Sequence, residues 1–385
     1  MDNLPFNMKI TIIGGGIAGL TTAIALNKIG IEATIFEASP EIKALGAGLV
    51  LAANAMQAYK KIGISAEIIE KGRLVPAFII YDQEGKVVTK TDSQANTEKY
   101  GADNFTIHRA HLHQLLLSKI NPNSITANKR ATHILQNGTK ITVTFHDGST
   151  HETDYLIVSD GIHSPIRKQL LPNSEPRYAG YTCWRAVIDN TNLKLTETSE
   201  TWGLKGRMGL VPLANNKIYW FACINAPQND PTMKAFKVAD LQAVFKDFHA
   251  PIPSVLAETK DENLLWNDII DLKPIHQYAF GNIVLIGDAA HATTPNMGQG
   301  ACQAIEDAVV LADEIKQNAT IEAAFKAFEK RRLKRTHYVV NTSWALGKVA
   351  QTESRLLAGL RNFIFRLIPK RMSAKQLENI YEVDF

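Results

Sequence analysis

Cysteine is scarce in this chain. Its three cysteines, Cys183, Cys223 and Cys302, are odd in number and lie far apart in the sequence. This arrangement argues against a disulfide framework and against a cysteine metal cluster. No other metal-ligand spacing and no Ser/His/Asp arrangement stands out. We therefore expect no metal site, and we expect the cysteines to be small buried apolar residues.

Long apolar runs are also missing. None is long enough to cross a membrane, and the N-terminus, which carries Asp2, lacks the basic start and cleavage site of a signal peptide. No interleaving of basic and aromatic residues suggests nucleic-acid recognition. We expect a cytoplasmic protein with no integral membrane segment and no nucleic-acid partner. Its 385 residues, 45% of them hydrophobic, suffice for two globular domains.

Positive charge is concentrated near the C-terminus. Segment 326–371 holds twelve Lys or Arg and two Glu, which leaves 30 basic and 36 acidic residues elsewhere. The last helix predicted there is amphipathic, with Leu356, Leu360, Phe363, Ile364 and Leu367 on one face and Arg355, Arg361 and Arg366 around it. Such a helix suits an anionic membrane surface or a nucleotide phosphate. The interpretation we prefer is a solvated basic side, with the apolar face buried in the protein.

The N-terminal region predicts a strand, a helix and a second strand. An apolar run over 10–13 enters a glycine-rich turn at Gly14, a helical pattern follows, and the strand over 33–36 ends at Glu37. This is the pattern of a βαβ unit that binds a dinucleotide. A plain strand-to-helix turn is the alternative, but the strand, the helix and the acidic residue all fall in register.

Each residue of this motif has a physical role in binding a dinucleotide. Gly14 permits the tight turn, Gly16 lets the backbone approach a pyrophosphate, and Gly19 lets the helix pack closely on the sheet. The helix start directs free amides and its dipole at the pyrophosphate. Glu37 is placed to accept hydrogen bonds from a ribose diol. The pattern leaves open whether the dinucleotide is FAD or NAD.

Other segments suit a flat, anionic ligand. Gly46 and Gly48 precede a helix and favour a loop that passes close to a flat ligand. Arg109 lies in the first turn of a helix, the unfavourable end for a cation, which indicates an anionic partner such as a phosphate; a solvent-exposed arginine is an equally good interpretation. Two further apolar strands, 155–158 and 283–286, also run into glycine- and aspartate-containing turns.

A series of short segments with alternating apolar residues predicts an antiparallel sheet. Residues 75–88 read as a hairpin followed by a polar loop to Asp103, and strands are expected over 181–188, 208–211 and 217–224. Aromatic residues on such a sheet are mostly core.

Three separated motifs together resemble the class A flavoprotein monooxygenases, the family of p-hydroxybenzoate, salicylate and FAD-dependent urate hydroxylases. They are Gly14-x-Gly16-x-x-Gly19 with Glu37, then Asp160-Gly161-x-x-Ser164-x-x-Arg167, and then Gly287-Asp288 continuing through Pro295 to Gly298-Gln299-Gly300. The likeness covers essentially the whole chain, and Arg109 falls between the first two motifs.

This resemblance implies an α/β fold. It implies a Rossmann-like FAD-binding domain of the GR2 type, a second domain built on an antiparallel β-sheet, and a helical C-terminus. The FAD-binding domain would be discontinuous (1–74, 100–179 and 275–350), the substrate-binding sheet domain would comprise 75–99 and 180–274, and 351–385 would form an amphipathic helix and tail.

The resemblance also implies non-covalent FAD and assigns residues to it. Glu37 would bind the adenosine ribose, Arg109 the flavin or its phosphates, and Asp288 the ribityl and pyrophosphate region. Segment 295–300 would lie against the isoalloxazine ring, with Gly48 in a nearby loop. In the family, Asp160 and Gly161 serve both FAD and NAD(P)H, and NAD(P)H docks transiently.

The activity implied is insertion of one oxygen atom from dioxygen into an aromatic or heteroaromatic substrate through a flavin hydroperoxide. The alternatives are an epoxidase, a tetracycline-type inactivating monooxygenase, and a flavin-dependent reductase that does not use oxygen. Arg207 and Tyr219 are the candidate substrate contacts, because their surroundings resemble urate hydroxylases. The Trp184-Arg185 pair looks closer to salicylate hydroxylases, so the substrate stays open. We expect a monomer or weak homodimer.

Overall fold

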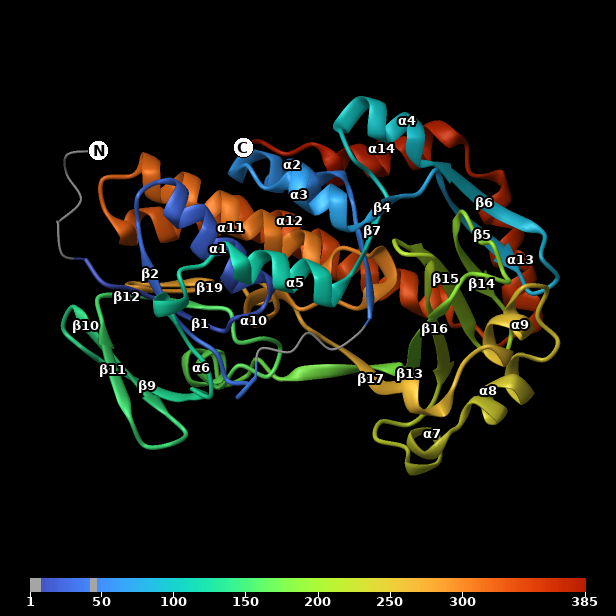
Figure 1. Cartoon of the computed structure of the whole chain (residues 1–385), viewed down its shortest axis with the longest axis horizontal. Helices are drawn as coiled ribbons and strands as arrows, with labels where there is room; N and C mark the ends of the chain where they lie inside the picture. The colour runs from blue at the N-terminus through green and yellow to red at the C-terminus, as the bar shows by residue number, and fades with distance from the viewer. Residues whose placement is uncertain (1–7, 42–46) are drawn as a thin grey trace.

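The computed structural model describes residues 8–41 and 47–385, without the side chains of 370–374 and 376. One end of the molecule is built on a mainly parallel sheet, and the other end on a second, larger sheet (Figure 1). The predicted fold class, a Rossmann-like α/β unit with a second β-sheet unit and a helical C-terminus, is confirmed. All three cysteines are free and buried, as predicted.

The first sheet has the strand order β18-β19-β12-β1-β2-β8. Its strands are β1 (Ile10–Ile13), β2 (Ala33–Phe36), β8 (Ile125–Thr126), β12 (Tyr155–Val158), β18 (Ala279–Phe280) and β19 (Ile283–Leu285). The strands β1, β12 and β19 are buried along their whole length, apart from Tyr155 at the start of β12. Unbroken apolar runs are typical of parallel strands covered on both faces.

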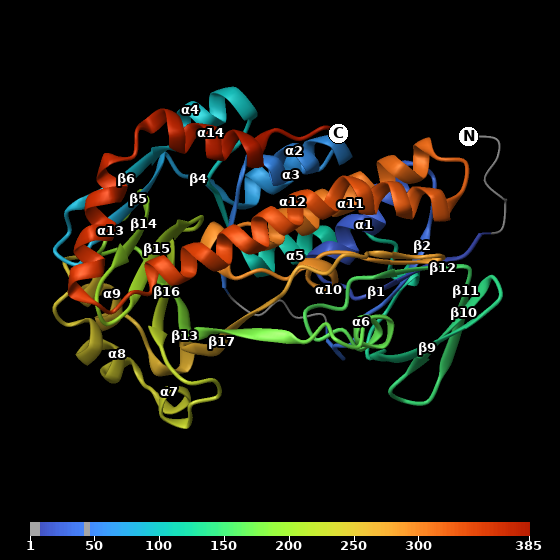
Figure 2. The same cartoon turned by 180° about the vertical axis from the view of Figure 1, so that it is seen from behind.

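Helices cover one side of this sheet, and a small sheet lies on the other (Figures 1 and 2). The helices include α1 (Ile17–Lys28), α11 (Gly300–Gln317) and α12 (Ile321–Ala350). The small sheet contains β9 (Ala131–Asn137), β10 (Lys140–Phe145) and β11 (Thr150–Thr153). Shorter elements complete this end: α2 (Ala53–Ile62), α3 (Ser65–Lys71), α5 (Arg109–Ser118), α6 (Pro165–Leu170), α10 (Asp288–His291), β3 (Gly48–Leu51), β4 (Arg73–Leu74) and β7 (Phe105–His108).

The second sheet has the order β17-β13-β16-β15-β14-β5-β6. Its strands are β5 (Ala77–Asp82), β6 (Val87–Asp92), β13 (Pro176–Asp189), β14 (Thr198–Trp202), β15 (Arg207–Leu213), β16 (Lys217–Asn225) and β17 (Leu265–Leu272). The predicted hairpin and three predicted strands are present. The sheet is antiparallel as expected except where β5 and β14 pair in parallel. Helices α7 (Pro231–Ala235), α8 (Val238–Phe245) and α9 (Ile252–Ala257) lie beside it.

Two expectations about helices were wrong. The stretch predicted as a loop before Asp103 contains helix α4 (Ser93–Tyr100), because the Asp92 carboxylate accepts hydrogen bonds from two amides of its first turn. The predicted C-terminal helix and tail is a pair of helices, α13 (Arg355–Leu367) and α14 (Lys370–Tyr381). Pro369 separates them and stands at the N-cap of α14.

The position of the α13 apolar face also differs from the expectation. Leu356 is 83% exposed, and its apolar neighbours along the helix are exposed as well. The face that we expected to be buried therefore points into solvent. Among the described residues, no helix combines the length and apolarity needed to cross a bilayer.

A buried ionic cluster joins α11 to α12. The Arg332 guanidinium donates to Asp307 (Nε to Oδ1, 2.7 Å) and to Glu306, and all three side chains are almost fully buried. Burial alone favours the neutral carboxyls, but the charged neighbours outweigh it: Arg332 and Arg335 lower the pKa of Glu306, and His291 and Arg332 lower the pKa of Asp307. Their contribution to stability is therefore present at neutral pH and is lost as the pH falls through the lowered pKa values.

We predict that Arg332→Met lowers the free energy of unfolding by about 3 kcal/mol, because it removes the cation that contacts both buried carboxylates. Chemical denaturation at pH 7 measures this loss. The matched control is Lys168→Ala, which removes an exposed ion pair with Glu175 and should change little. Equal effects of the two substitutions would contradict the role given to the cluster.

Candidate active site

The three sequence motifs meet at one edge of the first sheet. Strands β1, β12 and β19 are parallel neighbours, with Ile13 opposite Val158 and Val158 opposite Leu285. The turns that follow them therefore emerge side by side at the carboxyl ends of the strands. This edge is where open α/β sheets bind ligands.

The glycines of the first motif have different roles. Gly14 has φ +106°, and a Cβ there would collide with the Ser159 carbonyl. A Cβ on Gly19 would collide with the Gly14 carbonyl, so both positions need glycine for the fold itself. At Gly16 a Cβ would meet nothing within 4 Å. Gly16 thus leaves open space at the start of α1, where free amides favour an anion.

A cavity of about 590 Å³ runs from this turn to the second sheet. Most of the predicted residues line it: Gly14, Gly16, Glu37, Gly48, Arg109, Asp160, Gly161, Arg207, Tyr219, Asp288, Pro295, Gly298 and Gly300. Gly19 lies behind the turn. The Gln299 side chain accepts hydrogen bonds from Asn54 (2.9 Å) and Gln303 (3.1 Å) in the protein interior. Gly46 lies outside the described residues.

Glu37 is held in a fixed orientation at the end of β2. Its carboxylate accepts hydrogen bonds from the Gly15 amide (2.6 Å) and the Ser39 amide (2.7 Å). It also lines the cavity. The arrangement presents a rigid acceptor at one end of the cavity, as required for binding a ribose diol.

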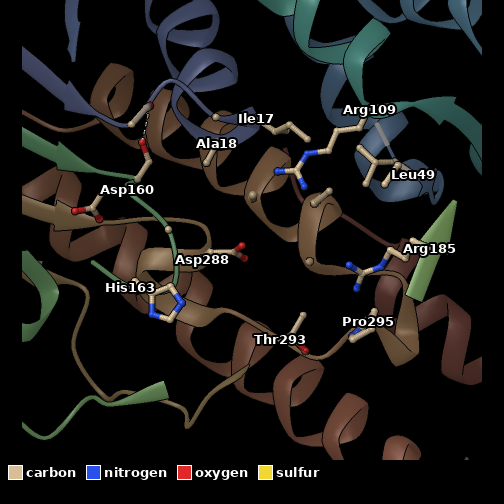
Figure 3. Close-up of a pocket in the computed structure, with 18 of the residues that line it drawn as sticks. Ile17, Ala18, Leu49, Arg109, Asp160, His163, Arg185, Asp288, Thr293 and Pro295 are labelled. Carbon is tan, nitrogen blue, oxygen red and sulfur yellow. Dashed lines mark hydrogen bonds between the residues drawn. The ribbon is translucent and has the colours of Figure 1, made fainter. Parts of the chain in front are cut away.

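Two further carboxylates lie along the cavity. Neither Asp160 oxygen finds a hydrogen-bond partner among the described residues, and burial raises the Asp160 pKa to about 6. Asp288 is exposed to the cavity, but the protein around it reduces its solvation and raises its pKa, although His291 and Arg109 oppose this. Figure 3 shows Asp288 and the Arg109 guanidinium directed into the pocket from opposite sides. These groups provide acceptors for hydroxyls and a cation for a phosphate.

The residues present fit FAD. The open turn at Gly16 suits a pyrophosphate, Glu37 suits a ribose, and the unpartnered Asp160 has acceptor capacity that the protein leaves unused. Helix α11 begins at Gly300, and its free amides suit negative charge on a reduced flavin ring. Among residues 8–41 and 47–385, no group of three or more potential ligands could hold a metal ion.

Buried polar contacts fix the turns around the cavity. The Arg167 guanidinium donates to the carbonyls of Ile162 (2.6 Å) and Ala289 (3.3 Å), which ties the second motif to the third. His291 contacts Asp307 (Nε2 to Oδ2, 2.6 Å), and Asp307 also accepts from the Gly287 amide. His291 is buried and does not line the cavity, so it supports the Gly287 turn from behind.

The second sheet closes the other side of the cavity. Cys183, Cys223 and Arg207 lie next to one another across β13, β16 and β15. The Tyr219 ring packs on Gly48, where a Cβ would lie 2.6 Å from the ring. The lack of a side chain at Gly48 therefore lets the Tyr219 ring pack against β3. The sequence alone did not reveal this requirement for glycine.

Arg207 is bound on several sides. Its guanidinium donates to Glu200 (Nη1 to Oε1, 2.8 Å), to the Tyr181 hydroxyl (3.3 Å) and to Asn296. The pair with Glu200 is almost fully buried. Glu200 was not among the predicted site residues because strand β14 was not predicted; the signal of this strand is the alternation of Thr198, Glu200 and Trp202.

Arg185 is a further guanidinium of the pocket and was not among the predicted site residues. Its side chain points into the pocket opposite Arg109, near Pro295 (Figure 3). It donates to the Asn267 side chain. Because side chains alternate along a strand, Arg185 lies on the same face as Cys183. This alternation is the sequence signal that could have placed Arg185 at the pocket.

Comparisons with known proteins agree with this geometry. The family model described as FAD binding domain matches residues 7–343. The aurachin C monooxygenase/isomerase of Stigmatella aurantiaca is 34% identical over 97% of this chain and 98% of its own. The 2-heptyl-3-hydroxy-4(1H)-quinolone synthase of Pseudomonas aeruginosa is 30% identical over 94% of both chains. The structure of Klebsiella pneumoniae HpxO with FAD and uric acid has a TM-score of 0.91 at 27% identity, covering 98% of each chain.

The chain belongs to the FAD binding domain family, among the class A aromatic monooxygenases. It is an FAD-dependent monooxygenase.

We predict that Gly16→Val abolishes FAD binding and leaves the fold intact, because the added side chain fills space that a pyrophosphate would occupy. The purified variant should be colourless with an unchanged circular dichroism spectrum. The matched control is Gly359→Val, since that position is equally open but lies on α13. A Gly16→Val protein that stays fully yellow would refute the placement of FAD.

We also predict that Asp160→Asn stabilises the FAD-free protein. The folded pKa of about 6 exceeds the unfolded value of about 3.9, so ionisation of Asp160 costs stability as the pH rises through this window. At pH 7 the free energy of unfolding of the variant should exceed that of the wild type by about 1–3 kcal/mol. This difference should vanish below about pH 4. A gain that is independent of pH would contradict this cause.

Proposed function

We propose that this enzyme uses NAD(P)H and dioxygen to hydroxylate a neutral, bicyclic nitrogen heteroaromatic ring of the 4-quinolone type. The name of the Pseudomonas relative describes a product of that type, and the match spans nearly all of both chains. A 4-quinolone presents a carbonyl oxygen and a flat apolar ring. The substrate side of the cavity offers complementary groups.

The observation that carries this proposal is the buried pair of Arg207 and Glu200. An arginine whose charge is already balanced attracts an anionic ring weakly. The Arg207 Nε is buried and has no hydrogen-bond partner among the described residues. Because Arg207 lines the cavity, a rotation of its side chain would turn this N–H toward a neutral carbonyl, and such a pairing would remove the cost of leaving the donor unsatisfied.

Tyr219 and Phe221 supply the apolar contacts. Both rings line the cavity, with their centroids 6.2 Å apart. They would lie against the substrate ring and keep water from the reacting edge. Bound FAD would supply the oxygen chemistry, while Arg109 and Asp288 would hold its phosphates and ribityl chain. Asp160 and Gly161 would serve FAD and NAD(P)H.

An anionic purine is a second candidate. The support for it is the structural similarity to HpxO, which was crystallised with uric acid, together with the Arg185 guanidinium in the pocket. Here Arg185 would pair with the anion in place of Arg207.

The test compares 2-heptyl-4(1H)-quinolone with urate as substrates of the FAD-loaded enzyme. We expect the quinolone to stimulate NAD(P)H oxidation with matched dioxygen uptake, and the product to gain one oxygen atom by mass. Stimulation by urate alone would support the purine candidate. NAD(P)H turnover that continues unchanged without oxygen would refute monooxygenation.

A charge substitution tests the role of Glu200. Glu200→Gln keeps the shape of the side chain but releases the full charge of Arg207, so we expect kcat/KM for the neutral ring to fall about tenfold. Binding of anionic ring compounds should tighten at the same time. Glu197→Gln is the matched control, because Glu197 is partly exposed and pairs with Lys90 outside the cavity. Equal kinetics for the two variants would contradict the proposal.

A further inference from the structure

Helix α13 presents its apolar side to solvent and its polar side to the protein. Six of its large apolar residues are 49–83% exposed: Leu356, Leu357, Leu360, Phe363, Ile364 and Leu367. The buried residues of the helix are Ala358 and Arg361. A helix that only covered a soluble core would show the opposite arrangement. A contiguous apolar patch of this kind marks an interaction surface.

Specific contacts fix this orientation. The Arg361 guanidinium lies 4.8 Å from the centroid of the Trp202 ring and donates to the Val349 and Ala350 carbonyls. Phe365 packs edge-on against the same tryptophan, with ring centroids 5.3 Å apart. Turning the helix to bury its leucines would break these contacts. The exposure is therefore a built feature of the fold.

Additional contacts tie α13 to the sheet edge and widen the patch. Arg366 donates to Asp82 (2.6 Å) and to the Val87 carbonyl (3.0 Å). Val87 on β6 and Val349 on α12 are themselves 48% and 41% exposed. Figure 2 shows α13 along the outer edge of the second sheet, at the end of the molecule away from the N-terminus.

The positive charge of segment 354–377 favours an anionic partner. From Ser354 to Leu377 the sequence contains six Lys or Arg and no Asp or Glu. Arg355 is exposed in the first turn of α13. Pairing this face with a second copy of the chain would bring identical cations together, and this segment has no acidic residue to offset them. An anionic lipid surface complements both the apolar stripe and the cations.

We propose that α13 docks the enzyme peripherally on anionic membranes. The helix lies in the plane of the interface, with its leucines and Phe363 in the boundary between headgroups and acyl chains and with the exposed Arg355 among the headgroups. Because no described helix can cross a bilayer, the association is reversible. The proposal holds for any ring that the enzyme oxidises.

Vesicle pelleting of the FAD-loaded full chain tests this proposal. We expect wild-type protein to pellet with vesicles of phosphatidylcholine mixed with phosphatidylglycerol, and much less with phosphatidylcholine alone. The triple variant Leu360→Gln, Phe363→Gln, Leu367→Gln should lose about tenfold or more in partitioning, because three exposed apolar anchors are removed. Unchanged flavin absorbance and circular dichroism verify that this variant is folded.

The matched control is the triple variant Ile69→Gln, Leu135→Gln, Leu265→Gln. It removes three exposed apolar residues from other parts of the surface and should pellet like the wild type. Absence of wild-type binding, equal binding to neutral vesicles, or an equal loss in the control would overturn the proposal. So would a wild-type dimer that the α13 variant converts to a monomer, since a second copy would then cover the face.

Discussion

The parallel alignment of β1, β12 and β19 is the constraint on which the site depends. Because the three strands are neighbours and run in the same direction, turns separated by more than a hundred residues emerge at one edge. The collision that a side chain at Gly14 would make with Ser159 shows how closely the first two turns approach. Without this alignment, Glu37, Asp160 and Asp288 would not line one cavity.

The protein holds this edge open at a cost in stability. The Asp160 carboxylate oxygens are buried and have no hydrogen-bond partner in the described part of the chain, and Gly16 leaves space that the fold does not need. Both features become favourable when a dinucleotide supplies hydroxyls and a pyrophosphate. The rigid support lies behind the cavity, in the buried contacts of Arg332 with Glu306 and Asp307. Functional sites commonly combine local strain with stabilisation elsewhere.

Contacts across the cavity join the two sheets. Asn296, from the third motif, accepts from Tyr181 (3.0 Å) and from Arg207, and it donates to the Ser343 carbonyl on α12. The position of the second sheet over segment 295–300 is therefore set by polar contacts as well as by packing. Arg207 is central to this junction, and Glu200 balances its charge there.

The cofactor side of the site could be predicted from sequence because its signals are local. Each strand runs directly into its turn, so a few neighbouring residues are enough to place Gly14, Asp160 and Asp288 at the ends of strands. Glu200 could not be predicted, because its pairing with Arg207 arises from the register of β14 with β15. The outward orientation of α13 could not be predicted either. Periodicity shows that a helix has two faces, but tertiary contacts such as Arg361 with Trp202 decide which face is buried.

The flavin content of the purified wild-type protein tests the central claim most directly. The convergence of three turns on one non-covalent prosthetic group predicts visible flavin absorbance and one FAD released per chain on denaturation. Protein that shows no flavin absorbance, even after reconstitution with FAD, would contradict the account.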